Sequence, residues 1–188
     1  EVINYGILPS GSMPVLLDHF GHNLGIIISA SHNPSEYNGI KLIDENGSKL
    51  QDEIEIEIEA NFTNISLPTA HTSFKDSEEG FKIYFEFLNK ILDFDLTNFD
   101  LLIDSANGSA YKIIEELLND NNSKFKIIAN APNGENINLN SGATHTENLI
   151  KNLKKDEIGV AFDGDADRLI MVDENGITCN GDVLILLI

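Results

Sequence analysis

The sequence has a single cysteine, no tryptophan and few basic residues. Because Cys179 has no second cysteine to pair with, the chain cannot form an internal disulfide, which fits a reducing cytosol. The 12 lysines and arginines are outnumbered by 31 aspartates and glutamates, and the formal net charge is -19. A surface of this sign argues against binding nucleic acid or adhering to anionic membranes. Any anionic ligand would need a local helix N-terminus, a few cations or a metal ion.

Long apolar runs are also missing, since none approaches the ~18 residues of a membrane span. No signal peptide precedes Glu1, so we expect a cytoplasmic protein. Hydrophobic residues make up 41% of the chain, which is enough for a core. The chain opens without Met and ends on an apolar run at residues 183–188. Both ends therefore predict a fragment of a longer protein.

Alternation of strand-like and helix-like segments predicts an α/β protein with two layered domains that have mixed sheets flanked by helices. We place a first domain at residues 1–95, a second at 96–180 and the start of a third at 181–188. The expected strands are 2–3, 25–28, 40–43, 101–103, 124–129, 158–162 and 169–172, with Cys179 also in a strand. The expected helices are one capped by Ser12 that runs to about 22, then 77–92, 110–118 and one capped by Thr144 and Glu147 that runs to about 155. Residues 64–75 are expected to form a polar loop.

Residues 52–62 fit two patterns. Ile54, Ile56 and Ile58 alternate with glutamates, which favours a strand. Ile54, Ile58 and Phe62 also recur at every fourth residue, which favours a helix. We predict a helix whose glutamates form a solvated face.

A serine, a histidine and an asparagine, Ser31, His32 and Asn33, follow the apolar run at 25–28. That run predicts a buried strand, and a second strand is expected after a turn at 38–39. A loop at the carboxyl end of a buried strand is the usual place for a site in an open α/β sheet. A polar connection without catalytic function is the alternative.

Three aspartates, Asp163, Asp165 and Asp167, stand at every second position in the segment between two expected strands. Carboxylates this close repel one another unless a cation neutralises them, and oxygen ligands select Mg2+ or Ca2+. An EF-hand loop is disfavoured, because Arg168 stands where that loop needs glycine and the flanking segments are strand-like. An acidic turn that binds no metal ion is the alternative interpretation of these three aspartates.

The two sites become one if Ser31 carries a phosphate. The phosphate would bring a charge of about -1.5 to -2 and oxygens that complete the shell of a metal ion held by the aspartates. Lys41 would exchange a proton with a substrate hydroxyl, given a pKa lowered by a cation such as Arg168. His32 and Asn33 would position the phosphoryl group by hydrogen bonds. These parts suit phosphoryl transfer, which depends on positioning and charge neutralisation.

Two segments carry a resemblance to a known family. Ser-Ala-Ser-His-Asn-Pro at 29–34, followed by Asn-Gly-Ile-Lys at 38–41, resembles the phosphoserine loop and catalytic lysine of the α-D-phosphohexomutases. Asp-Gly-Asp-Ala-Asp-Arg at 163–168 resembles their Mg2+ loop. The resemblance covers essentially the whole chain: the latter part of the family's first domain, its second domain and the start of its third.

The resemblance implies a phosphohexomutase-like fold, incomplete here, and a mutase activity through a phosphoserine enzyme and a sugar 1,6-bisphosphate. The segments at 104–108, 136–138 and 142–145 are most similar to the branch that interconverts glucosamine 6-phosphate and glucosamine 1-phosphate for peptidoglycan precursor synthesis. Sister enzymes act on mannose or glucose phosphates. Sugar-selecting loops would follow Ile188, so we expect the fragment alone to be inactive.

The resemblance also implies the functional residues and cofactors. The catalytic residues would be Ser31, His32, Asn33, Lys41 and Arg168, and phosphorylated Ser31 would join the three aspartates around one Mg2+ ion. The partners would be a phosphosugar substrate and a 1,6-bisphosphate activator, with no nucleic acid and no membrane. Two other classes stay open: a divalent-metal-binding module without catalysis, and a serine hydrolase suggested by Ser31 beside His32. Oligomeric state is open too.

Overall fold

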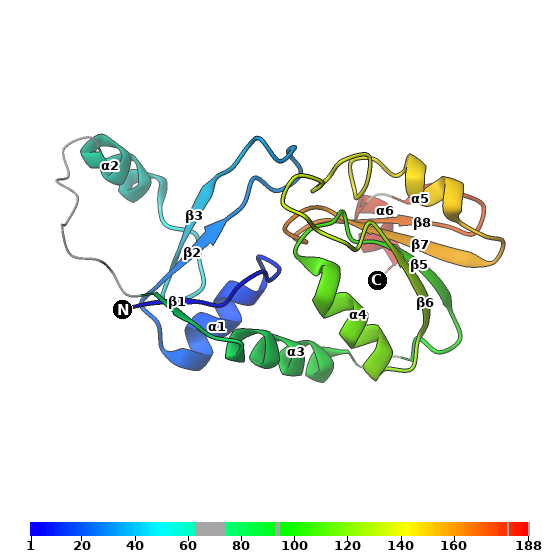
Figure 1. The fold of residues 1–188 in the computed structure, drawn as a ribbon, viewed down its shortest axis with the longest axis horizontal. Coiled ribbons are helices and arrows are strands. Elements are labelled where there is room, and N and C mark those ends of the chain that lie inside the picture. The colour runs from blue at the N-terminus through cyan, green and yellow to red at the C-terminus, as the bar shows by residue number, and fades with distance from the viewer. Residues whose placement is uncertain (63–73, 93–94, 180, 188) are drawn as a thin grey trace.

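The computed structural model describes residues 1–62, 74–92, 95–179 and 181–187. It has two α/β parts, which we call the first part (residues 1–92) and the second part (residues 95–179); each has its own sheets, and they meet side by side (Figure 1). This confirms the expected α/β class, with sheets flanked by helices. The exact domain limits stay a prediction.

The first part holds two small sheets and three helices among the described residues. Strand β1 (Val2–Asn4) pairs in parallel with β4 (Phe74–Asp76), and β2 (Leu24–Ile28) pairs antiparallel with β3 (Ile40–Asp44). Helix α1 (Ser12–Phe20) lies against β2 and against α3 (Glu79–Ile91), which leads toward the second part (Figure 1). The order of elements follows the predicted one except at β4, which lies at the end of a segment, 64–75, that was predicted to be a polar loop.

Strand β2 is less buried than we predicted. Gly25 is buried against α1, where an added Cβ would collide with the side chain of Met13, whereas Ile26 and Ile28 are 52% and 69% exposed. Because side chains alternate between the two faces of a strand, one helix on one face leaves the other face open. An apolar run alone does not distinguish a strand covered on two faces from one covered on one.

The reversal between β2 and β3 also differs from the prediction. The turn lies earlier than 38–39, where the N–H of Tyr37 donates to the carbonyl of Pro34 at 3.0 Å. The N–H of Ser29 donates to the carbonyl of Gly39 at 3.0 Å, so the chain before β3 already follows the partner strand. The loop that carries Ser31 is therefore closed at its base by a backbone hydrogen bond.

Residues 52–62 form a helix, α2 (Asp52–Phe62), as predicted. None of its residues is buried, and its glutamates face solvent or pair with Lys49, as Glu55 does at 2.9 Å. The polar loop expected after it lies, up to residue 73, outside the described residues. No helix in the described ranges is long and apolar enough to cross a bilayer.

The second part is built on one five-stranded mixed sheet in the order β6-β5-β7-β8-β9. Three strands are parallel, namely β6 (Lys124–Ile128), β5 (Asp100–Asp104) and β7 (Glu157–Phe162), and β8 (Leu169–Val172) and β9 (Thr178–Cys179) continue it antiparallel. Cys179 is thus a strand residue, as predicted. Helix α6 (Gly181–Leu187) ends the described chain.

Helices α4 (Ala110–Asp120) and α5 (Glu147–Asn152) cover opposite faces of this sheet (Figure 1). Alternation along β5 explains how both faces acquire a core. Leu102 packs with Leu149 of α5, and its neighbours Leu101 and Ile103 pack with Leu118 of α4. The carboxyl ends of the parallel strands then lead into the loops that form the site.

The predicted helix ends are wrong by one to three residues in several helices, and α5 and α1 show why. Helix α5 starts at Glu147 with Thr146 as its N-cap and no side-chain capping bond, so Thr144 does not cap it, and the helix ends at Asn152 rather than near 155. Helix α1 takes Gly11 as its N-cap, so the expected cap Ser12 is its first residue, and the helix ends at Phe20 rather than near 22. Short polar side chains near a helix start are common enough that sequence spacing alone misplaces the cap.

Candidate active site

Ser31 meets the aspartate loop of the second part. Its Oγ donates a hydrogen bond to Oδ2 of Asp163 at 2.8 Å and accepts one from Nη2 of Arg168 at 2.8 Å. Its backbone is left-handed, with φ 53°, and its N–H donates to Oγ of Ser29 at 2.9 Å. The structure thus brings together residues more than 130 positions apart that the sequence had placed in one site.

The three aspartates cluster as predicted. One carboxylate oxygen from each of Asp163, Asp165 and Asp167 lies within 4.8 Å of the other two. Asp163 and Asp165 are buried, and Oδ1 of Asp165 has no hydrogen-bond partner among the described residues. A buried carboxylate oxygen without a donor is costly, and oxygen donors at this spacing suit a hard divalent cation. The residues present therefore fit an Mg2+ ion.

Two close backbone approaches shape the aspartate loop. At Gly164 an added Cβ would lie 2.5 Å from the carbonyl oxygen of Ser31, and at Gly108 it would collide with the carbonyl oxygen of Gly164. The N–H of Ser109 donates to that same Gly164 carbonyl at 2.8 Å. Glycine at both positions lets the loop after β5, the loop after β7 and the Ser31 loop touch.

Lys41 extends from β3 into the cluster. Its Nζ lies 2.8 Å from Oδ2 of Asp165 and 3.5 Å from Oδ2 of Asp167. Burial alone would lower the pKa of Lys41, but its hydrogen bond and ion pair with Asp165, followed by Asp167, raise it. The expected lowering of this pKa is therefore wrong for this arrangement, in which Lys41 faces carboxylates. Arg168 instead lies beside Ser31, with Nε 3.5 Å from Asp163.

The buried aspartates differ in the direction of their pKa shifts. Burial raises the pKa of Asp163, although hydrogen bonds from the Ser31 hydroxyl and the Arg168 N–H partly offset it. Burial acts in the same direction on Asp165, but the hydrogen bond and charge of Lys41 outweigh it, and its pKa is lowered. The pKa values of the two carboxyls thus shift in opposite directions because Asp165 faces the Lys41 ammonium and Asp163 does not.

His32 and Asn33 lie at the exposed tip of the loop. Within the described part of the chain, the imidazole of His32 has no hydrogen-bond partner. The amide of Asn33 donates to the carbonyl of Ala30 at 3.1 Å. Neither side chain hydrogen-bonds Ser31 among the described residues, so the structure places them near the hydroxyl without assigning them a contact.

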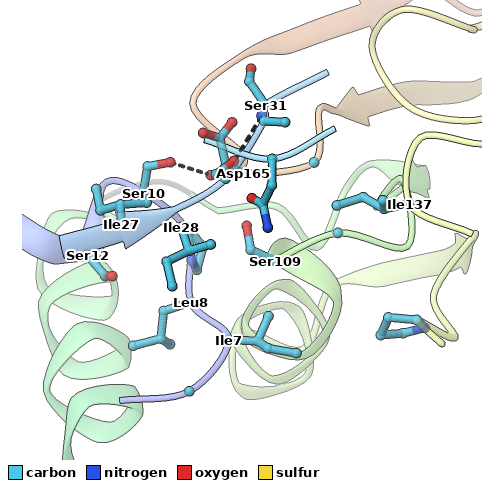
Figure 2. Close-up of a pocket in the computed structure, with 18 of the residues that line it drawn as sticks. Ile7, Leu8, Ser10, Ser12, Ile27, Ile28, Ser31, Ser109, Ile137 and Asp165 are labelled. Carbon is cyan, nitrogen blue, oxygen red and sulfur yellow. Dashed lines mark hydrogen bonds between the residues drawn. The ribbon is translucent and has the colours of Figure 1, made fainter. Parts of the chain in front are cut away.

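A cavity of about 590 Å³ lies behind the Ser31 loop (Figure 2). Its lining is largely apolar and includes Ile7, Leu8 and Ile28, and no lysine or arginine is among its described lining residues. In Figure 2 the Ser31 hydroxyl points away from these apolar side chains. An anionic ligand needs cations, so the cation-bearing side of Ser31 suits it better than this cavity.

Sequence reasoning missed two residues that hold the site together. The N–H and the Oγ of Ser10 both donate to the carbonyl of Asp165, at 2.9 and 3.1 Å. The amide of Asn138 donates to the carbonyls of Ser31 and Asn33, at 2.8 and 3.0 Å. Polar side chains that bind distant backbone carry no local pattern, so only the fold reveals these contacts.

Two family models match nearly the whole chain. They are phosphoglucomutase/phosphomannomutase alpha/beta/alpha domain I, over residues 1–69, and domain II of the same family, over residues 82–176. The chain belongs to this family. The resemblance that the motifs indicated is confirmed, and the Ser31 loop falls in domain I and the aspartate loop in domain II.

Known members resemble the chain in sequence and fold. A phosphoglucosamine mutase from Clostridium kluyveri is 40% identical over 197 aligned residues, covering 100% of the chain and 44% of that protein. A phosphoglucomutase/phosphomannomutase family protein from Burkholderia thailandensis has a TM-score of 0.75 at 23% identity, over 95% of the chain and 41% of its own. Aspergillus fumigatus N-acetylphosphoglucosamine mutase, solved with GlcNAc-6P and magnesium, has a TM-score of 0.54 at 16% identity. This match covers 95% of the chain and 52% of the Aspergillus protein chain. The chain thus spans less than half the length of its curated relative.

Proposed function

We propose that the chain carries the phosphoserine and metal centre of a phosphoglucosamine mutase. The reaction would interconvert glucosamine 6-phosphate and glucosamine 1-phosphate through a 1,6-bisphosphate. The observation that carries the proposal is the position of the Ser31 hydroxyl, 2.8 Å from both Asp163 and Arg168 and beside a three-carboxylate cluster. Inactivity of the 188-residue chain by itself and a cytoplasmic location stay predictions.

Each side chain has a part in the transfer. In one half-reaction, the bond between Ser31 Oγ and phosphorus breaks as a sugar hydroxyl oxygen forms its bond to phosphorus, and the second half-reaction returns the phosphoryl group from the other position. Arg168, already hydrogen-bonded to Oγ, would neutralise charge on the phosphoryl oxygens. His32 and Asn33, at the exposed tip of the loop, would orient those oxygens.

Asp163, Asp165 and Asp167 would hold one Mg2+ ion, together with an oxygen of phosphorylated Ser31. When bound, the ion supplies charge neutralisation at the phosphoryl group. With the carboxylates engaged in this way, the ion pairs that raise the pKa of Lys41 would weaken, and burial, which lowers it, would remain. Lys41 would then accept the proton of the attacking hydroxyl and return it.

Two other classes have less support. A metal-binding module without catalysis accounts for the aspartates but leaves the Ser31 contacts unexplained. A serine hydrolase needs a base at the serine, and the Ser31 hydroxyl donates to Asp163, not to His32. Mannose or glucose phosphate as the sugar is an outcome of the test below.

The test uses the complete product of the gene, assayed with glucosamine, mannose and glucose 6-phosphates, Mg2+, and with and without a sugar 1,6-bisphosphate. We expect preference for the glucosamine ester, phosphate on Ser31 by mass spectrometry, and loss of both in Ser31→Ala. Ser35→Ala, an exposed serine of the same loop, is the matched control and should keep activity. Full activity in Ser31→Ala would refute the proposal, and preference for another sugar would move the chain to a sister branch.

A further inference from the structure

Among the described residues, Asn138 of the second part is the side chain that hydrogen-bonds the backbone of the Ser31 loop. Both of its hydrogen bonds come from Nδ2, to the carbonyl of Ser31 at 2.8 Å and to the carbonyl of Asn33 at 3.0 Å. Asn138 is 6% exposed, so these bonds are shielded from water. The two carbonyls flank His32, and one amide group therefore holds both ends of the three-residue tip.

Asn138 is itself fixed to the sheet of the second part. Its N–H donates to the carbonyl of Ala106 at 2.9 Å, and the N–H of Ala106 donates to Oδ1 of Asp104 at 2.9 Å, at the carboxyl end of β5. The backbone of Asn138 is left-handed, with φ 58°, a conformation that asparagine tolerates better than most residues. Gly164 closes the other side, where an added Cβ would lie 2.8 Å from Nδ2 of Asn138.

The other hydrogen bonds of the Ser31 loop cannot hold its backbone against the second part throughout the reaction. Those to Asp163 and Arg168 involve Ser31 Oγ, which is the atom that gains and loses a phosphoryl group under the proposed function. Those from Ser31 N–H to Ser29 and from Asn33 N–H to Ala30 stay within the loop. Asn138 binds backbone carbonyls, which do not change during the reaction.

We propose that Asn138 is a positioning residue that holds the Ser31 peptide in register with the aspartate loop. It acts through the backbone of the loop and touches neither substrate nor metal ion. The amide is needed because an aspartate at this position would place an oxygen against two carbonyl oxygens. This inference rests on the proposed function only for its effect on rate, because the attachment of the loop is a property of the folded chain.

The test compares Asn138→Ala with Asn140→Ala in the complete gene product. Both asparagines have left-handed backbones, φ 58° and 52°, so both substitutions carry similar backbone strain. Asn140 is exposed, and its side chain has no hydrogen bond within the described residues. Only Asn138→Ala should speed amide hydrogen exchange in residues 29–39. Its kcat should fall roughly 10- to 100-fold, with KM and the Mg2+ dissociation constant changed by no more than about twofold.

Asn138→Asp keeps the size of the side chain and replaces the donating NH2 group with a carboxylate oxygen. This variant is the second test if Asn138→Ala does not fold. It should reproduce both effects. Unchanged exchange in 29–39 would overturn the inference, as would an equal loss of kcat in Asn140→Ala. If the wild-type protein shows no mutase activity, the proposed function fails, and the exchange comparison still decides whether Asn138 holds the loop.

Discussion

Asp104 shows how a single buried carboxyl can set a pH dependence of stability. It is fully buried at the end of β5, and burial raises its pKa, although the N–H groups of Gly142 and Ala106 partly offset the effect. The folded state therefore holds the proton more tightly than the unfolded state. Stability from this group is greatest at low pH and falls as the pH rises from the unfolded pKa of about 3.9 through the raised folded pKa.

Asp104→Asn should remove this dependence. The amide keeps an oxygen that can accept from Ala106 and carries no charge into the buried site. We expect the melting temperature of the variant, relative to that of the wild type at the same pH, to increase as the pH rises from about 4 to about 8. Asp18→Asn, an exposed position on α1, is the control and should follow the wild type. Parallel melting curves for Asp104→Asn and the wild type across this range would contradict the prediction.

Among single residues, those with local chemistry were predictable and those with distant partners were not. Ser31, Lys41 and the three aspartates stand in short motifs, and the structure brings them within hydrogen-bond or ion-pair distance. Asn138 and Ser10 bind backbone carbonyls far along the chain, so local spacing does not predict these contacts, even though Asn138 lies in the segment 136–138 that resembles the family. In the arrangement of the structure the pKa of Lys41 is raised rather than lowered, because it depends on which charges surround the amine in space.

At the scale of elements, burial decides which helices matter for stability. Leu149 of the six-residue helix α5 is fully buried and packs with Leu102 and Val172, and it is the only residue of this short helix that is buried. Leu149→Ala should lower the free energy of unfolding by about 2–5 kcal/mol, from lost apolar burial and the cavity left behind. Chemical denaturation measures the loss.

Helix α2 is the matched comparison. Ile56 is 65% exposed and α2 buries no residue, so Ile56→Ala should change stability by no more than about 0.5 kcal/mol. A loss in Ile56→Ala as large as that in Leu149→Ala would show that α2 is covered in solution. The sequence predicted α2 and the strand β2 as elements but misjudged the burial of β2, because periodicity gives the face of an element and its neighbours decide what covers that face.

At the scale of the whole molecule, the site lies where the two parts meet. The first part supplies Ser31 and Lys41, and the second part supplies the aspartates and Arg168. In a chain with net charge -19, the only cations paired with this cluster in the described residues are Lys41 and Arg168. Removing part of the carboxylate repulsion should therefore stabilise the contact between the parts as well as the loop itself.

Mg2+ is expected to provide that stabilisation. A ligand that binds only the folded state at about 100 times its dissociation constant adds about 2.7 kcal/mol to the free energy of unfolding. Thermal unfolding with increasing Mg2+ should thus show a rising melting temperature, and chelation should reverse it. Asp165→Asn removes a charged ligand from the buried centre of the cluster. The Mg2+ concentration needed for the same rise in melting temperature should therefore increase at least tenfold, which corresponds to about 1.4 kcal/mol of binding free energy. Asp18→Asn removes one exposed charge on α1 that is not paired with the cluster, and it should respond as the wild type does. Equal Mg2+ responses in the two variants would mean that the three aspartates do not bind the ion.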